Sequence, residues 1–260
     1  MPVDWSEVQK SISPIKDYED LCQRLHESFS YPFVCVAFNK TMPELANYTQ
    51  LCVGGDPRGR YNEYASLLNK IFAQLHKAGV HNVLELIGQV ETCEKFENFV
   101  AQSGIQPRDI AVALKYLIYW FIPMGKYLSG LVRDEPEISE AIKVLRESGV
   151  RTNLDLLQRG ITPAGRKALA EASRLPEAVI SELVNMADFS RLPWASKATI
   201  SNIMGAGYAS LSQLRNANPE QLYADFYRYG QAIGKNLKLG NEIENSYRIA
   251  KIVPVVVQEE

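Results

Sequence analysis

Apolar residues recur at helical spacing over most of the chain. Between residues 61 and 252 the clearest example places them three or four positions apart, at Ala65, Leu68, Ile71, Phe72 and Leu75. Residues 4–30 show the same spacing, with Leu21, Leu25 and Phe29. Such spacing gives a helix one apolar face, so the pattern predicts a mainly α protein with one or two helices at its start.

Three short runs have a different pattern. Residues 33–38 and 50–53 are rich in β-forming side chains, and the second run ends at a Gly-rich stretch, 54–60. They predict a small β-hairpin, and hence an α+β portion within residues 1–60. Residues 252–257 are also β-prone, and Pro254 would confine them to an edge strand that pairs with the N-terminal strands.

One sequence pattern occurs three times: an apolar residue, a glycine four positions later, another apolar residue, and then a predicted short second helix. The glycines are Gly79, Gly149 and Gly207, spaced 70 and 58 residues apart. A glycine at this place predicts a left-handed end to the preceding helix. Pro107 and Pro176 follow the first two glycines by 28 and 27 residues and predict further helix starts. We therefore expect tandem units at about 61–136 and 137–206, with a shorter third piece.

Residues 110–132 are apolar enough to be considered as a membrane span. They contain Lys115 and Lys126, each of which would cost about 2.5–3.5 kcal/mol near the middle of a membrane helix. Pro123 would also interrupt such a helix. Two buried helices broken at Ile122-Pro123 are the favoured interpretation, with no membrane segment.

Residues from about 138 to 250 resemble a bacterial and archaeal domain of unknown function, domain of unknown function 4332, which is related to helix-hairpin-helix proteins. The resemblance rests on two motifs, Thr162-Pro163-Ala164-Gly165-Arg166 with Leu169, and Ala187-Asp188-Phe189-Ser190-Arg191 followed by Leu192-Pro193. It implies tandem helix-hairpin-helix-like units. We divide the chain into an N-terminal region (1–60), a first helical hairpin unit (61–136) and a helix-hairpin-helix-like domain with a C-terminal tail (137–260).

The resemblance also raises nucleic-acid binding, because related hairpins hold phosphate through two glycines at a helix start. Residues 192–203 lack both glycines and have Trp194 and Ser196 in the corresponding stretch. Ser196 would cap the helix and could donate to a phosphate, beside Lys197. The charge between Phe189 and Lys251 is +4, with tyrosines interleaved. The candidate phosphate-binding residues are Arg191, Ser196, Lys197, Lys235 and Lys238, although a solvated helix face is the favoured interpretation.

Catalytic and metal-binding patterns are absent from the sequence. Cys22 with His26, and Cys35 with Cys52 across the expected hairpin, are the conceivable metal ligands, but buried small side chains are the favoured interpretation without a Cys-x-x-Cys pair. Arg58 and Arg60 flank Gly59, but residues 54–60 lack the Gly-Lys-Ser/Thr ending of a phosphate loop and are better explained as a surface turn. We expect no enzyme activity, metal or cofactor.

Composition narrows the function further. The net charge of −2 provides no overall attraction to nucleic acid or anionic lipid. The cysteine usage and the absence of a leader-like start at Met1 favour the cytoplasm. We expect a non-catalytic protein-interaction or scaffold module with a degenerate helix-hairpin-helix and a protein partner. The alternative is a nucleic-acid-binding accessory protein that contacts the phosphate backbone through residues 191–199 and C-terminal basic residues.

Overall fold

The computed structural model describes residues 3–56, 58–132, 135–193, 195–237 and 241–259. Within these ranges the chain forms sixteen α-helices and no strand, so the mainly α prediction is confirmed. The helices divide between two compact units, Met1–Ile122 and Pro123–Glu260. The division into residues 1–60, 61–136 and 137–260 that was expected from the sequence stays a prediction. None of the described helices is both long enough and apolar enough to span a membrane.

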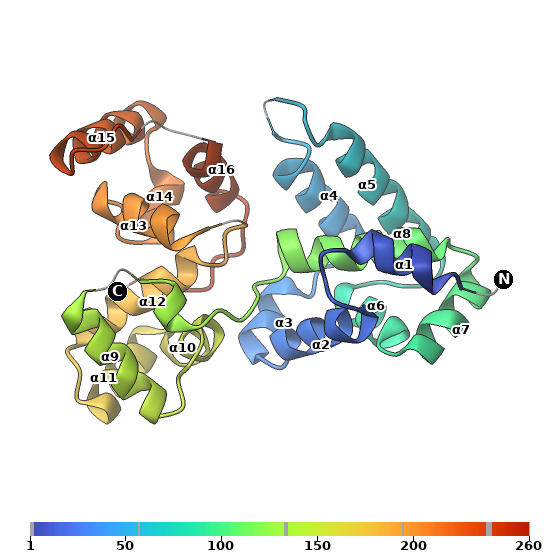
Figure 1. Cartoon of the computed structure of the whole chain (residues 1–260), viewed down its shortest axis with the longest axis horizontal. Coiled ribbons are helices and arrows are strands. Elements are labelled where there is room, and N and C mark those ends of the chain that lie inside the picture. The colour runs from blue at the N-terminus through green and yellow to red at the C-terminus, as the bar shows by residue number, and fades with distance from the viewer. Residues whose placement is uncertain (1–2, 57, 133–134, 194, 238–240, 260) are drawn as a thin grey trace. The chain divides into compact units, whose positions relative to one another are not determined.

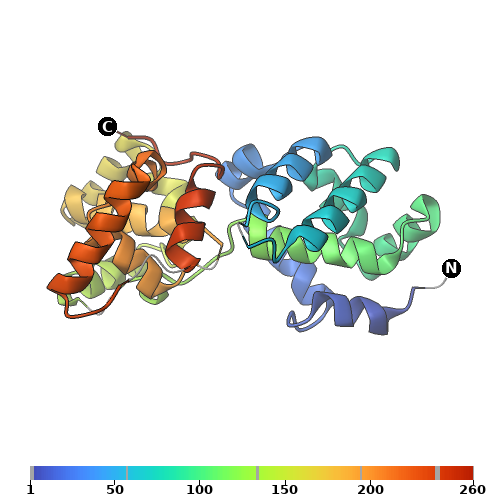
Figure 2. The same cartoon turned by 90° about the horizontal axis from the view of Figure 1, so that it is seen from above.

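The first unit surrounds α8 (Pro107–Tyr116), which continues into a π-helical turn, η1 (Leu117–Phe121). Its other helices are α1 (Trp5–Ile12), α2 (Tyr18–Phe29), α3 (Pro32–Phe38), α4 (Met42–Cys52), α5 (Asn62–Lys77), α6 (Val83–Val90) and α7 (Cys93–Ser103). Figure 2 shows α8, in light green, between α5 and α1, and both helices contact it. The residues of α8 that face them, including Ile110 and Leu114, are fully buried.

The predicted β-hairpin is wrong, because both of its runs are helical. Pro32 begins α3, where its missing N–H costs little, and Phe33, Val34 and Phe38 are buried along that helix. Residues 50–52 form the end of α4 and Val53 is its C-cap; a reciprocal capping box between Thr41 and Glu44 fixes the start of this helix. Helix-start signals therefore outweigh the β-propensity of these short runs.

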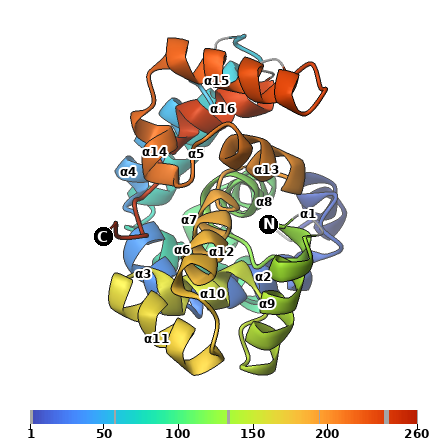
Figure 3. The ribbon, with the colours of Figure 1, turned by 90° about the vertical axis from the view of Figure 1, so that its left-hand side faces the viewer.

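The second unit is built around α12 (Glu177–Phe189). Its other elements are a 3₁₀ turn, η2 (Leu128–Gly130), and the helices α9 (Pro136–Glu147), α10 (Asn153–Gly160), α11 (Pro163–Ser173), α13 (Lys197–Gly205), α14 (Leu211–Asn216), α15 (Pro219–Ala232) and α16 (Asn241–Ala250). Figures 1 and 3 show α12 between the pair α10 and α11 and the pair α13 and α14, and α12 contacts α10, α11 and α14.

The chain break predicted at Ile122-Pro123 is confirmed, but the second buried helix expected after it is wrong. Residues 126–128 instead pair in extended form with residues 151–153, through bonds from Leu128 N to Arg151 O (3.1 Å) and from Asn153 N to Lys126 O (2.9 Å). Residues 40–42 pair with residues 81–83 in the same way in the first unit. The two pairings extend the similarity between the units beyond the helices.

The three predicted glycine turns are confirmed. Gly79, Gly149 and Gly207 have φ values of +87°, +83° and +103°. In each turn the amide of the next residue donates to a carbonyl five positions back; these bonds are Val80 to Leu75 (3.0 Å), Val150 to Leu145 (2.9 Å) and Tyr208 to Ile203 (3.2 Å). A polar residue then caps the short second helix, namely Asn82, Thr152 or Ser210. These bonds satisfy backbone groups that helix ends would otherwise leave unpaired.

Two glycines of the first unit provide a matched test of this turn. We expect Gly79→Ala to lower the free energy of unfolding by about 1–2 kcal/mol, because alanine is strained at positive φ. Gly88 lies on the exposed side of α6, and a Cβ there would meet nothing within 4 Å. Gly88→Ala should therefore raise the free energy of unfolding by about 0.5–1 kcal/mol. Urea unfolding followed by circular dichroism measures both, and equal effects of the two substitutions would contradict the turn assignment.

Candidate functional site

Residues 252–259, here called the valine segment, form no strand, and the N-terminal runs with which they were expected to pair are helical. The edge-strand prediction is therefore wrong. The segment runs along the second unit, where the Gln258 amide donates to the carbonyl of Ile161 (2.8 Å). Val253 is buried, whereas Val255 is 65% exposed. Main-chain contacts with three arginines hold the segment in place, and two of these arginines end the sequence motifs quoted above.

The first of these arginines is Arg166, at the end of the Thr-Pro-Ala-Gly-Arg motif. Thr162 caps α11 by accepting the Gly165 amide (3.0 Å), and Pro163 occupies the first helical position. A Cβ at residue 165 would lie 2.1 Å from the Arg159 carbonyl, so the close approach of α10 and α11 requires glycine there. Arg166 is consequently buried, and its Nη1 donates to the carbonyls of Gly160 (3.3 Å) and Gln258 (3.2 Å).

The second arginine, Arg191, ends the other motif. Its Nε donates to Asp188 Oδ1 (2.7 Å), and its Nη1 donates to the Pro254 carbonyl (3.1 Å). Only 1% of the Arg191 side chain and 6% of the Asp188 side chain are accessible. Burial raises the pKa of the Asp188 carboxyl, while the charges of Arg191 and Arg215 oppose that rise. The motif therefore supplies a buried ion pair that carries the valine segment.

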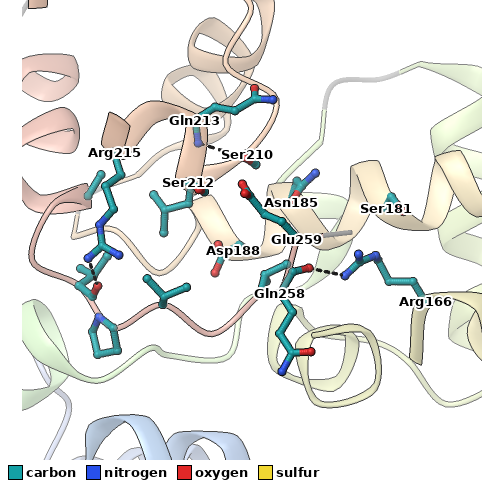
Figure 4. A pocket seen from close by; sticks show the side chains of 16 residues that line it. Arg166, Ser181, Asn185, Asp188, Ser210, Ser212, Gln213, Arg215, Gln258 and Glu259 are labelled. Atoms are coloured by element: carbon teal, nitrogen blue, oxygen red, sulfur yellow. Dashed lines mark hydrogen bonds between the residues drawn. The ribbon is translucent and has the colours of Figure 1, made fainter. Parts of the chain in front are cut away.

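The third arginine, Arg215, lies at the end of α14. Its Nη2 donates to the carbonyls of Lys251 (2.9 Å) and Val253 (3.0 Å). Figure 4 shows Arg215 and Arg166 reaching the segment near its two ends, with Asp188 between them. Between the segment and helices α12 and α14 lies a cavity of about 310 Å³, here called the segment cavity. Its polar lining includes Ser181 and Asn185 from α12 and Ser212 from α14.

The residues predicted to bind phosphate are distributed differently from the expectation. Arg191 is directed into the second unit, as described above. Ser196 caps α13, where its Oγ accepts the Thr199 amide (3.1 Å), and half-buried Lys197 follows as the first helical residue. Lys235 is exposed after α15. Lys238 and Trp194 lie outside the described residues. The structure thus brings Ser196 and Lys197 together and gives Arg191 a different environment.

Sequence reasoning did not single out Arg166, Asp188 and Arg215 as functional residues. A signal was present for two of them. Asp188 and Arg191 are three positions apart at the end of an apolar helix, a spacing that lets a carboxylate and a guanidinium meet. Arg166 stands in the first turn of α11, where a cation is unfavourable unless it has another acceptor. Arg215 carries no comparable signal, because its acceptors lie 36 and 38 residues away.

Metal and phosphate sites receive no support from the described residues. No group of three or more His, Cys, Asp or Glu side chains there is arranged to hold a metal ion. Cys35 lies on α3 and Cys52 on α4, so the hairpin that would have joined them does not exist. In the 54–60 loop, leaving aside residue 57, Arg60 pairs with Asp56 (3.1 Å) and Gly59 adopts φ +65°, as in an ordinary turn.

Comparison with known families identifies part of the second unit. Residues 137–242 match the family described as Domain of unknown function (DUF4332). The match includes both motifs and confirms the resemblance stated above, while the valine segment lies beyond it. No curated protein and no solved structure matches the chain.

Two arginines that each lie three positions after an aspartate give a matched test of the buried pair. We expect Arg191→Ala to lower the free energy of unfolding by about 3–5 kcal/mol, because it leaves the Asp188 carboxylate buried without its partner. Arg228 pairs with Asp225 (3.2 Å), but 74% of its side chain is accessible. Arg228→Ala should therefore cost no more than about 1 kcal/mol. Chemical denaturation of both variants measures the difference, and a similar cost for both would contradict a stabilising role of the buried pair.

Proposed function

We propose that this chain, through the DUF4332 domain at residues 137–242, is a non-catalytic protein-interaction or scaffold module. The observation that carries the proposal is the environment of the motif arginines. Arg166 and Arg191 both donate to main-chain carbonyls of an extended polypeptide segment. Because the two motif arginines of the domain bind polypeptide carbonyls, the domain is suited to bind a protein. Tandem helical units provide extended surfaces for such contacts.

The degenerate hairpin supports the same proposal. The two glycines that would let a phosphate approach a helix start are missing from residues 192–203. At the start of α13 the Thr199 amide already has an acceptor, the Ser196 hydroxyl. A phosphate there would have to displace that cap, which stabilises a helix by about 1 kcal/mol. The hairpin therefore retains its structural role while offering fewer donors to nucleic acid.

A second candidate function, nucleic-acid binding, is favoured by the surface of α15. Tyr223 and Tyr227 lie one helical turn apart and are 57% and 55% exposed. Arg228 on the same helix and Lys235 after it are also exposed. Aromatic and basic side chains on one surface provide stacking and phosphate contacts for single-stranded nucleic acid. This candidate predicts salt-sensitive binding, because each phosphate contact releases counterions.

A titration of the full chain with double-stranded, single-stranded and branched DNA at 50 and about 200 mM salt separates the two functions. The protein-interaction proposal predicts no measurable retention of any of these DNAs at the lower salt concentration. A protein partner should instead be recovered with the intact chain and keep its affinity when Lys197 and Lys235 are changed to alanine.

Nucleic-acid binding would give the opposite result. Affinity for DNA would fall steeply between the two salt concentrations, and the Lys197→Ala, Lys235→Ala variant would lose affinity and show a smaller salt slope. Lys143→Ala is the control, because Lys143 is an exposed lysine of α9 at a distance in sequence from these residues. Salt-dependent binding that the double variant weakens and the control leaves unchanged would overturn the proposed function.

A further inference from the structure

The hydrogen bonds that the valine segment makes to the rest of the unit come from its backbone, while Val253 is also buried. The carbonyls of Val253, Pro254 and Gln258 accept hydrogen bonds from three arginines, and the Gln258 amide donates to Ile161. Because these groups are present in every polypeptide, the contacts specify an extended conformation more strongly than a sequence. This is how proteins hold extended peptides, with main-chain bonds for affinity and pockets for side chains.

The arginines beneath the segment are buried while the segment is in place. Arg191 is almost completely inaccessible, and Arg166 is buried as well. Removing the segment would expose these guanidinium groups to water, so they would exchange protein carbonyls for water molecules. Another polypeptide that offers carbonyls at the same places would restore the lost hydrogen bonds.

A cavity lies beside the segment. The segment cavity of about 310 Å³ lies beside Val253, Val255 and Val257. Its size is at the lower end of the range of ligand-binding pockets, and it has room for a side chain larger than valine. Ser181, Asn185 and Ser212 line it and supply hydroxyl and carboxamide groups for hydrogen bonds. The rest of the lining is largely apolar and includes Leu211 and Ala250, so the cavity suits a side chain with an apolar stem and a polar end.

We propose that the surface formed by Arg166, Arg191 and Arg215 is a binding site for an extended peptide of a partner protein, and that the valine segment is its intramolecular competitor. The inference rests on the proposed function and names its site. The partner peptide presents carbonyls at three positions, equivalent to Val253, Pro254 and Gln258, and an amide at the last of them. Between the second and third positions it places in the segment cavity a long side chain with an apolar stem and a polar end.

The tether sets the strength of the competition. A segment joined to its own site acts at an effective concentration in the millimolar range, so a free peptide of equal intrinsic affinity binds the intact chain weakly. Weakening the internal contact should raise the affinity for an added peptide. Gln258 provides a way to do so, because its side chain is exposed and its amide makes the bond to Ile161.

The experiment uses the full-length chain with Gln258→Pro, which removes that amide donor. Gln258→Ala is the matched control, because it changes the same exposed side chain and leaves the amide donor in place. The probe is a fluorescent synthetic peptide with the sequence of residues 252–259, measured by anisotropy. We expect Gln258→Pro to bind it roughly five- to tenfold more tightly than the wild-type chain, in line with the loss of one hydrogen bond. Gln258→Ala should match the wild type.

Adding Arg166→Ala to the Gln258→Pro chain should abolish the gain, and thermal unfolding of each variant identifies any loss of folding. Because Arg166 is buried and its replacement could affect folding, Ser212→Trp serves as a second variant of the peptide site. The tryptophan side chain would fill the segment cavity. Ser212→Trp should lower the affinity for a peptide that has glutamine in place of Val255 more than it lowers the affinity for the valine peptide. The inference is overturned if folded Gln258→Pro binds the peptide no better than the wild type.

Two other outcomes separate this inference from the proposed function. A protein partner that binds the wild-type, Gln258→Pro and Arg166→Ala chains equally would leave the protein-interaction proposal standing and overturn the peptide site. Concentration-dependent dimerisation of Gln258→Pro in sedimentation equilibrium, reversed by the free peptide, would identify a second copy of this chain as the occupant. That result would overturn the claim of a separate partner protein.

Discussion

A buried guanidinium must find acceptors within the protein, and this requirement organises the second unit. Arg191 obtains one acceptor from Asp188 in α12 and another from the carbonyl of Pro254. Arg166 uses carbonyls at the end of α10 and in the valine segment. Charged hydrogen bonds of this kind contribute about 1.5–3 kcal/mol each, and leaving the donors unpaired would cost at least as much. Segments far apart in the sequence are therefore held together by two side chains that use a distant acceptor as well as a local one.

The same requirement applies to the backbone, because both units consist of short helices. An α-helix leaves four amides and four carbonyls without partners at its ends, and in a helix of eight residues these are a large share of all its groups. The glycine turn followed by a polar cap satisfies several of them at once. At Gly79, Gly149 and Gly207 the turn is followed by a short, capped second helix in each copy. In the second unit, this turn sets α10 and α14 beside α12, from which Asp188 extends.

The sequence predicted the features that depend on local chemistry. Glycine at a helix end and the prolines at Pro107 and Pro176 have direct backbone consequences, and the structure contains them where expected. The prediction from the β-prone runs failed because β-branched residues also occur in helices with strong start signals, here the Thr41 capping box of α4 and Pro32 at the first position of α3. Burial of Arg191 depends on a carbonyl 63 residues away. No local pattern contains that information, so a cation expected at the surface lies in the interior.

The measurement that tests the account most directly is amide hydrogen exchange at Gln258 in the wild-type chain and in Arg166→Ala. The central claim is that the motif arginines hold a polypeptide segment, and the Gln258 amide reports on that segment through its bond to Ile161. We predict protection of this amide in the wild type and exchange roughly 10- to 100-fold faster in the variant, the effect of one charged hydrogen bond. The amide of Val150, in the glycine turn of the same unit, should be little affected. An unprotected Gln258 amide in the wild type, or equal protection in both proteins, would contradict the account.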